Sequence, residues 1–116
     1  YDTPAGTCIR DYVHVMDLVE AHVLGLKWVQ DGKPSRVFNL GTGSGFSVRE
    51  VIDRAEAITG RTVPVVEGLR RPGDCTKLVS GSSRAMTELG WTPERSTLDR
   101  MIGDAWRWHQ TGHYDK

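Results

Sequence analysis

The feature that most constrains this chain is the segment FNLGTGSGFSVRE, residues 38–50, in which three alternate glycines stand between a short apolar run and a helix. The helix is indicated over residues 47–59 by apolar residues at helical spacing and by Gly60, which stands where a left-handed C-terminal cap belongs. Ser47 and Glu50 have the S-x-x-E spacing of a capping box, so they place its first turn. The segment therefore predicts a strand, a tight turn and a capped helix in direct succession.

Strands and helices are predicted to alternate along the rest of the chain. Residues 8–15 suit a short strand or an extended active-site segment. Short strands are indicated over residues 36–40, 62–66 and 75–79, with Pro64 favouring an edge position for the second of these. Helices are indicated over residues 18–30, 82–89 and 98–110; Asp17 and Glu20 form a capping box before the first, and Gly90 ends the second. This alternation is typical of an α/β fold. No repeat or linker divides residues 1–116, so we expect a single unit.

The predicted helix over residues 18–30 is apolar on more than one face. Its apolar positions are Leu18, Val19, Ala21, Val23, Leu24, Leu26 and Trp28. A helix of this kind needs other elements on both sides to cover it. We therefore expect a homo-oligomer such as a dimer, or an altered arrangement, to bury these faces.

Charge and hydropathy exclude several kinds of partner. Fifteen basic residues balance fifteen acidic ones, which leaves no electrostatic footprint for nucleic acid or an anionic membrane. No apolar run approaches the roughly 18–20 residues that span a bilayer.

Cys8 and Cys75 lack CxxC spacing, so we interpret them as free thiols in a reducing cytoplasm. The chain starts at Tyr1 without methionine, which predicts a piece of a longer protein.

The glycine turn invites comparison with a dinucleotide-binding loop, but its pattern differs. The fingerprint is G-x-G-x-x-G with a carboxylate about 20 residues further on, whereas Gly41, Gly43 and Gly45 are spaced by two and two. The predicted Ser47–Glu50 box also engages donors at the start of the helix and puts negative charge there. We interpret the turn as a structural connection with no cofactor-binding residue. A cofactor loop, or a turn lining a substrate cleft without holding phosphate, stay as alternatives.

Two arginine-containing segments are candidates for binding an anionic ligand. In GTCIRDYVHV, Arg10 and Tyr12 are two residues apart on an extended stretch and point to the same side. In LRRPGDCTKL, the Pro-Gly turn brings Arg71 close to Asp74. A guanidinium suits phosphate, an aromatic ring suits a base, and a carboxylate suits ribose hydroxyls. From spacing alone, the first segment is better explained by a surface salt bridge beside a half-buried tyrosine, and the second by an ordinary surface turn.

The histidines give no comparable signal. His109 and His113 have the i,i+4 spacing of a helical zinc pair, but Gly112 ends the helix between them and no third ligand accompanies them, so we predict no metal site. His14 and His22 lack a Cys or Ser nucleophile pattern. We expect these two side chains to be packed or hydrogen-bonded, and we assign no catalytic residue.

The order of five segments resembles one enzyme family. GTCIRDYVHVMDLVEAHV, FNLGTGSGFSV, RRPGD, SSRAMTELGW and DAWRWHQ follow one another over nearly the whole chain. Together they resemble the C-terminal part of the UDP-glucose 4-epimerases (UDP-galactose 4-epimerases), which are extended short-chain dehydrogenases/reductases. The resemblance implies an α/β, C-terminal substrate-binding portion whose N-terminal Rossmann part is missing.

The resemblance also implies roles for individual residues. Arg10 and Tyr12 fall where family members contact the nucleotide of a UDP-sugar. Arg71 and Asp74 fall where they bind diphosphate and ribose. Leu78 falls where a side chain lines the sugar pocket, and it leaves open whether an N-acetyl group is admitted. The glycines of NLGTG belong to the C-terminal part in the family and are not its NAD fingerprint.

The family's catalytic apparatus is not matched in these residues. Family members carry a glycine-rich NAD turn near the N-terminus and a Tyr-x-x-x-Lys pair, whereas Tyr1, Tyr12 and Tyr114 have no lysine four residues later. The resemblance therefore implies an inactive fragment of an isomerase whose complete form interconverts UDP-glucose and UDP-galactose, with NAD held by the missing part. Alternatives are another nucleotide-sugar epimerase or dehydratase of the superfamily, or a non-catalytic nucleotide-binding module.

Overall fold

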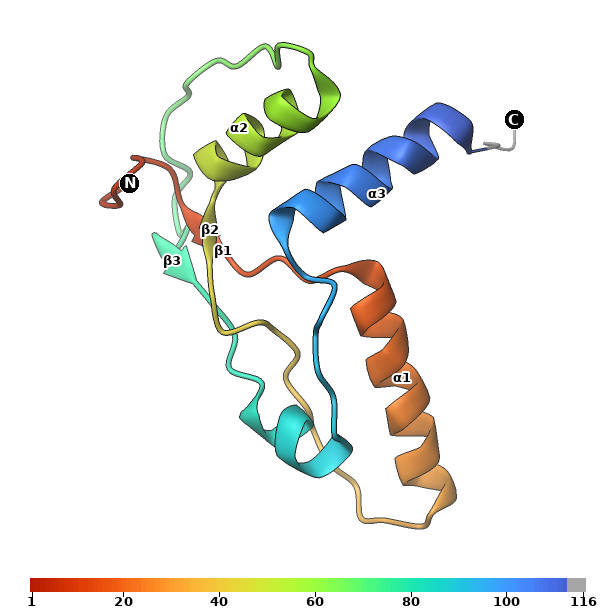
Figure 1. Ribbon diagram of the computed structural model, residues 1–116. Helices are drawn as coiled ribbons and strands as arrows, with labels where there is room; N and C mark the ends of the chain where they lie inside the picture. The colour runs from red at the N-terminus through yellow and green to blue at the C-terminus, as the bar shows by residue number, and fades with distance from the viewer. Residues whose placement is uncertain (113–116) are drawn as a thin grey trace.

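A computed structural model describes residues 1–112 (Figure 1). Three helices, one short π-helix and three two-residue strands follow one another along them, which confirms the α/β prediction. The order is β1 (Ile9–Arg10), α1 (Val15–Gln30), β2 (Phe46–Ser47), α2 (Val48–Thr59), β3 (Lys77–Leu78), the π-helix η1 (Ala85–Leu89) and α3 (Leu98–Thr111). The chain is elongated, with extents of 50 × 38 × 26 Å. In Figure 1 the strands lie at the base of α2, α3 packs against α2, and α1 extends away from them next to the cyan η1.

The small sheet joins three distant parts of the chain. Its strand order is β2-β1-β3. Strand β1 pairs antiparallel with β2, Ile9 opposite Ser47, and parallel with β3, Arg10 opposite Leu78. This pairing places the residues after the glycine turn and the residues after RRPGD on either side of Arg10.

The strand predictions are only partly right. The strands expected over 8–15 and 75–79 form over two residues each, and those expected over 36–40 and 62–66 are wrong. Val37 and Val66 are 75% and 94% exposed. A strand is stable only beside a partner strand, and within residues 1–112 neither segment is paired in the sheet.

Helix α1 begins earlier than its sequence suggests. It starts at Val15, where His14 is the N-cap and its ring nitrogen accepts a hydrogen bond from the Met16 amide. The capping box predicted from Asp17 and Glu20 is therefore wrong. Asp17 is fully buried, and its carboxylate accepts instead from the hydroxyl of Ser96 at 2.6 Å. Asp17 therefore makes a tertiary contact, although its spacing from Glu20 is typical of a helix cap.

Helices α2 and α3 match their predictions. The Ser47 hydroxyl accepts from the Glu50 amide at 3.1 Å, and Gly60 ends α2 in the left-handed conformation at φ 69°. Helix α3 spans Leu98–Thr111 and is capped by Thr97. The two helices pack against each other, and the side chains of Arg54 and Asp99 join them at 2.7 Å. Strong amphipathic periodicity with a local cap suffices to define such helices.

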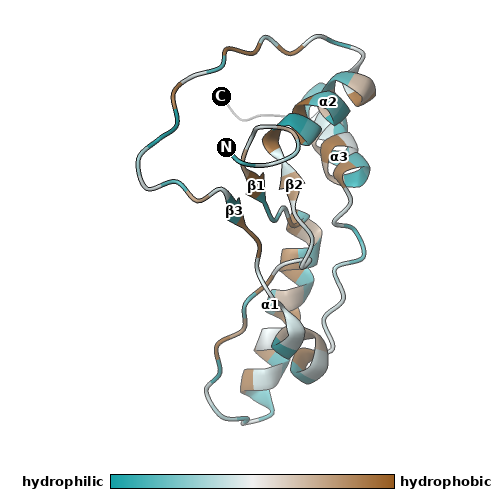
Figure 2. Cartoon of the chain, turned by 90° about the vertical axis from the view of Figure 1, so that its left-hand side faces the viewer, coloured by the Kyte–Doolittle hydropathy of each residue, from teal (hydrophilic) through white to brown (hydrophobic). Residues whose placement is uncertain are grey.

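The hydrophobic core is small and lies between α1 and η1. It is centred on Ala21, Ala85 and Trp91, and the Trp91 indole donates to the Asp17 carbonyl at 2.7 Å. The opposite face of α1 exposes a row of large apolar side chains. Figure 2 colours much of α1 as hydrophobic. We call this row the outer face of α1; it comprises Val15, Met16, Val19, Val23, Leu26 and Val29. The prediction that this helix is apolar on more than one face is confirmed.

Candidate functional site

Three of the predicted site residues meet at one point. The guanidinium of Arg10 contacts the Asp74 carboxylate at 2.8 Å, and that of Arg71 contacts its other oxygen at 3.2 Å. The Tyr1 hydroxyl donates to the same oxygen at 2.6 Å. Asp74 is 16% exposed, whereas Arg71 is 81% exposed. We call these four residues, together with Arg70, the arginine cluster.

The fold assembles this cluster by strand pairing and a tight turn. Parallel pairing of β1 with β3 carries Asp74 beside Arg10, and the Ile9 amide donates to the Thr76 carbonyl at 2.9 Å. Arg10 also donates to the Cys75 carbonyl at 2.9 Å. The turn brings Arg71 to Asp74, as the Pro-Gly pair predicts, with Gly73 at φ 78°. No spacing rule relates Arg10 to Asp74, because the two are 64 residues apart.

The charges of the cluster are unbalanced. Two arginines contact the one carboxylate, and a third, Arg70, donates to the backbone carbonyl of Asp74 and lies over the Tyr1 ring at 4.8 Å. The hydrogen bond from Tyr1 lowers the pKa of the Asp74 carboxyl below 3.8; Arg71 and Arg10 act in the same direction, and burial opposes them. The same hydrogen bond raises the pKa of the Tyr1 phenol above 10.0. At neutral pH the cluster is therefore cationic around an ionised carboxylate, which suits a phosphate together with a hydroxyl donor.

Tyr12 follows Arg10 by two residues in the chain, and Leu78 lies next to Arg10 in the sheet. Tyr12 is half-buried, and burial raises the pKa of its phenol above 10.0 while the Arg10 charge opposes that shift. Leu78 lies opposite Arg10 in the sheet and is 59% exposed. Arg10 and Leu78 both line a cleft of about 490 Å³. An exposed apolar side chain beside a cationic group is thus available to any ligand held by the arginines.

The glycine turn is filled by a side chain that the sequence reading missed. The Asp11 carboxylate accepts from the Thr42 amide at 3.0 Å, the Thr42 hydroxyl at 2.8 Å and the Gly43 amide at 3.2 Å. It also accepts from the Ser80 amide at 3.2 Å. The Thr42 and Gly43 amides, which a phosphate at this turn would need, thus already donate to Asp11. In the sequence, the signal that could have indicated this role is an acidic residue directly after Arg10, a candidate ligand-binding residue.

Close packing explains two of the three glycines. A Cβ on Gly41 would lie 2.7 Å from an Asp11 carboxylate oxygen and 2.8 Å from the Ser80 carbonyl. A Cβ on Gly45 would collide with Ile9. The third, Gly43, takes φ 76°, where a side chain is strained. The glycines therefore let three chain segments approach each other, which is a structural role.

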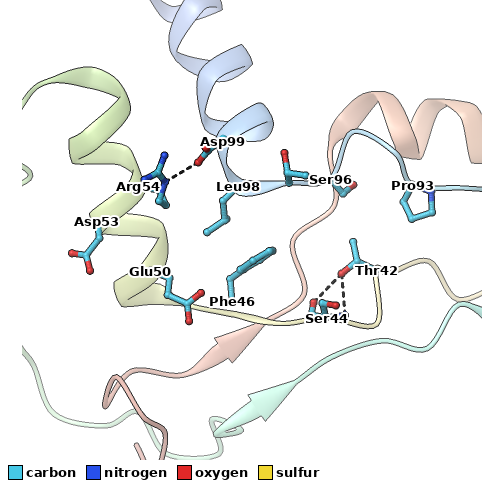
Figure 3. Close-up of a pocket in the computed structure, with 11 residues that line it drawn as sticks. Thr42, Ser44, Phe46, Glu50, Asp53, Arg54, Pro93, Ser96, Leu98 and Asp99 are labelled. Carbon is cyan, nitrogen blue, oxygen red and sulfur yellow. Dashed lines mark hydrogen bonds and ion pairs between the residues drawn. The ribbon is translucent and has the colours of Figure 1, made fainter.

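A second cavity, of about 910 Å³, lies between α2 and α3 (Figure 3). Phe46 and Leu98 point toward each other across it, and the Arg54–Asp99 ion pair lies at its edge. Thr42 and Ser44 line it from the glycine turn, so the turn does border a cavity. The candidate nucleotide-contacting residues are not among its lining residues.

His14 and His22 are hydrogen-bonded, as predicted. His14 is buried and contacts Asp104 at 2.7 Å, and His22 donates to the Leu18 carbonyl. His113 lies outside the described residues. No cluster of three or more potential metal ligands occurs within residues 1–112, and Cys8 and Cys75 are free. None of the helices in this part of the chain has the length and apolarity to cross a membrane.

Comparison with known proteins identifies the family. The model of the family described as GDP-mannose 4,6 dehydratase matches residues 5–104. UDP-glucose 4-epimerases of Lactobacillus helveticus and Azospirillum brasilense are 45% and 47% identical to this chain, over 100% and 96% of its length. The chain therefore belongs to this family of extended short-chain dehydrogenases/reductases and is similar to UDP-glucose 4-epimerases. It spans about a third of these relatives, 36% and 32% of their lengths.

Solved structures agree with that assignment. A crystal structure of a UDP-glucose 4-epimerase superimposes with a TM-score of 0.93 at 47% identity, covering 100% of this chain and 36% of that one. The enzyme of Bifidobacterium longum, solved with NAD+ and UDP, superimposes with a TM-score of 0.83 at 42% identity, covering 97% and 33%. The predicted extended short-chain dehydrogenase/reductase fold is confirmed.

Proposed function

We propose that this chain is the UDP-sugar-binding portion of a UDP-glucose 4-epimerase, whose complete form interconverts UDP-glucose and UDP-galactose with bound NAD. The arginine cluster carries this proposal. Three guanidinium groups around the ionised Asp74 match a ligand that combines a diphosphate with a ribose diol. The similarity to epimerases, one of them solved with UDP, supports the same ligand class.

Each residue then has a distinct task in binding. Arg10 and Arg71 hold the diphosphate, and Asp74 accepts hydrogen bonds from the ribose hydroxyls. Tyr12 contributes its half-buried ring beside Arg10 to the nucleotide, and Leu78 borders the sugar. These groups bind and orient the substrate. They exchange no proton or hydride with the sugar carbon, so we assign no catalytic residue.

NAD supplies hydride transfer in the complete enzyme, but the glycine turn does not fit it. The amides that would face a pyrophosphate already donate to Asp11. We therefore propose that another part of the complete enzyme holds NAD and that this chain alone is inactive. Mixing the chain with NAD and UDP-galactose should form no UDP-glucose by coupled assay. Steady turnover in that mixture would overturn the proposed division of labour.

Direct binding measures the central proposal. Isothermal titration calorimetry should detect UDP binding to the chain, and Arg71→Ala should weaken it by about tenfold or more because a charge-assisted contact is lost. Arg49→Ala is the matched control, since Arg49 is an exposed arginine on α2 paired with Asp53. Equal effects of the two substitutions, or no UDP binding by the unsubstituted chain, would contradict the proposal.

A second candidate is another nucleotide-sugar epimerase or dehydratase of the same family, favoured by the description of the family model that matches. Competition separates the two. UDP-glucose should displace UDP from the chain, whereas GDP-mannose should not if the epimerase assignment is right. UDP-N-acetylglucosamine tests in the same experiment whether Leu78 leaves room for the acetamido group.

We also propose that the chain pairs with a second copy through the outer face of α1. Val15, Val19, Leu26 and Val29 fall near-symmetrically about His22, so a two-fold antiparallel arrangement sets apolar residues opposite each other. Light scattering should give a dimer, and Val19→Glu should give a monomer with an unchanged circular dichroism spectrum. A monomer before substitution would overturn the pairing.

The two free cysteines support a reducing, cytoplasmic location.

A further inference from the structure

Asp11 joins the end of β1 to two other segments of the chain. From the end of β1 it reaches the glycine turn through Thr42 and Gly43, and it reaches the strand-to-helix segment after β3 through Ser80. Four donors, three of them backbone amides, converge on its two oxygens. Amides pointing into one concavity form an anion site, and here the anion is part of the chain.

The neighbours of Asp11 connect it to ligand binding. Arg10 precedes it on β1, and Leu78 stands two residues before Ser80. Asp11, Ser80, Arg10 and Leu78 all line the same cleft of about 490 Å³. A shift of the turn or of Ser80 would therefore move the side chains that flank the proposed substrate.

Gly41 makes the arrangement intolerant of movement. The site of its absent Cβ is occupied by the Asp11 carboxylate and by Ser80, so the carboxylate fits only against a bare backbone. The β1 to β3 pairing spans two residues per strand and cannot hold register alone. Hydrogen bonds to a charged acceptor are stronger than neutral ones, and they tie both neighbouring segments to β1.

We infer that Asp11 is a positioning residue: its carboxylate is the built-in anion of the glycine turn, and it fixes Arg10 and Leu78 for the ligand. The role as built-in anion stands on the geometry alone, whereas the effect on the ligand rests on the proposed function. Removing the carboxylate should leave a vacant anion site whose donors a small free carboxylate can satisfy.

Formate rescue of Asp11→Ala tests this directly. The UDP affinity of the variant should be lower by a factor of about ten or more. Added formate should restore that affinity and raise the Tm of the variant. The Thr42, Gly43 and Ser80 amide resonances should shift with formate. Asp53→Ala, at an exposed aspartate of α2, is the control and should gain nothing from formate. Asp11→Asn keeps the shape of the side chain but removes its charge, so it replaces the alanine variant if that variant does not fold. Its loss of UDP affinity should be smaller than that of Asp11→Ala.

The outcomes separate this inference from the proposed function. If the unsubstituted chain binds no UDP, the proposed function fails, and the formate effect on Tm and on the three amides still decides the role of Asp11. If the chain binds UDP and Asp11→Asn binds it equally well, the positioning role is wrong while the proposed function stands. Formate shifts that are the same in Asp11→Ala and Asp53→Ala would overturn the built-in anion.

Discussion

Two aspartate–arginine clusters in this molecule use the same residue types for different ends. Asp17 is fully buried, and its carboxylate is held by Ser96 and Arg95, the second of which also binds Glu20. Asp74 is partly open and faces three arginines. Around Asp17 two acids share one arginine, whereas around Asp74 the arginines are in excess.

This difference in burial and charge balance distinguishes a structural junction from a binding site. The Asp17 junction ties α1 to the segment before α3, and its donors are internal to the fold. The arginine cluster keeps an uncompensated positive charge, with Arg71 largely in solvent. Charge that the fold leaves unneutralised at an accessible point is available to an anionic ligand.

The largest expected effect is on the buried side of the comparison. Asp17→Ala should lower the free energy of unfolding by about 3 kcal/mol, because Ser96 and Arg95 lose a buried, charged acceptor. Urea denaturation measures it. Glu20→Gln, which removes the exposed partner of the same arginine, should change stability far less. Similar losses for both would show that the Asp17 junction owes its strength to Arg95 alone.

The reverse pattern is expected for Asp74. Asp74→Asn should weaken UDP binding by about tenfold while changing the urea midpoint little, because its partner Arg71 is largely in solvent and can turn to water. Calorimetry and denaturation on the same sample check both halves. A loss of stability comparable to that of Asp17→Ala would erase the distinction between the clusters.

Tyr1 should have a smaller effect of opposite sign. Its hydroxyl occupies an Asp74 oxygen that the proposed ribose would need, so Tyr1→Phe should tighten UDP binding a few-fold. A titration with UDP alongside the unsubstituted chain measures the change. Weaker binding by Tyr1→Phe would mean that the hydroxyl holds Asp74 in place for the ligand instead of competing with it.

The smallest expected effect is the pH dependence of the arginine cluster. The pKa of Asp74 is depressed in the folded chain, so its contribution to stability is fully present above 3.8 and is lost as the pH falls through the lower folded value. The pKa of Tyr1 is raised, so its contribution is present below 10.0 and is lost as the pH rises through the higher folded value. NMR titration of the Asp74 carboxyl carbon should show its transition below 3.8. A transition above 3.8 would contradict the assigned contacts.

Helices α2 and α3 follow from the sequence because their caps and apolar periodicity involve only residues close together in the chain. Ser47 caps α2, Gly60 ends it, and the periodicity of α3 needs no knowledge of distant residues. The Arg71–Asp74 pair follows in the same way, because a Pro-Gly turn joins residues three apart. Periodicity also showed that α1 has apolar residues to cover on more than one side.

Tertiary structure alone decided the rest, because its partners lie far apart in the chain. Two acids show this: Asp17 is drawn from a capping position to Ser96, and Asp11 is drawn into the glycine turn. The contact of Arg10 with Asp74 depends on parallel pairing of strands only two residues long, which no alternation pattern can reveal. A carboxylate accepts hydrogen bonds from whichever donors the fold brings within reach. The donors to Asp11 and Asp17 come from residues 31 to 79 positions away in the chain.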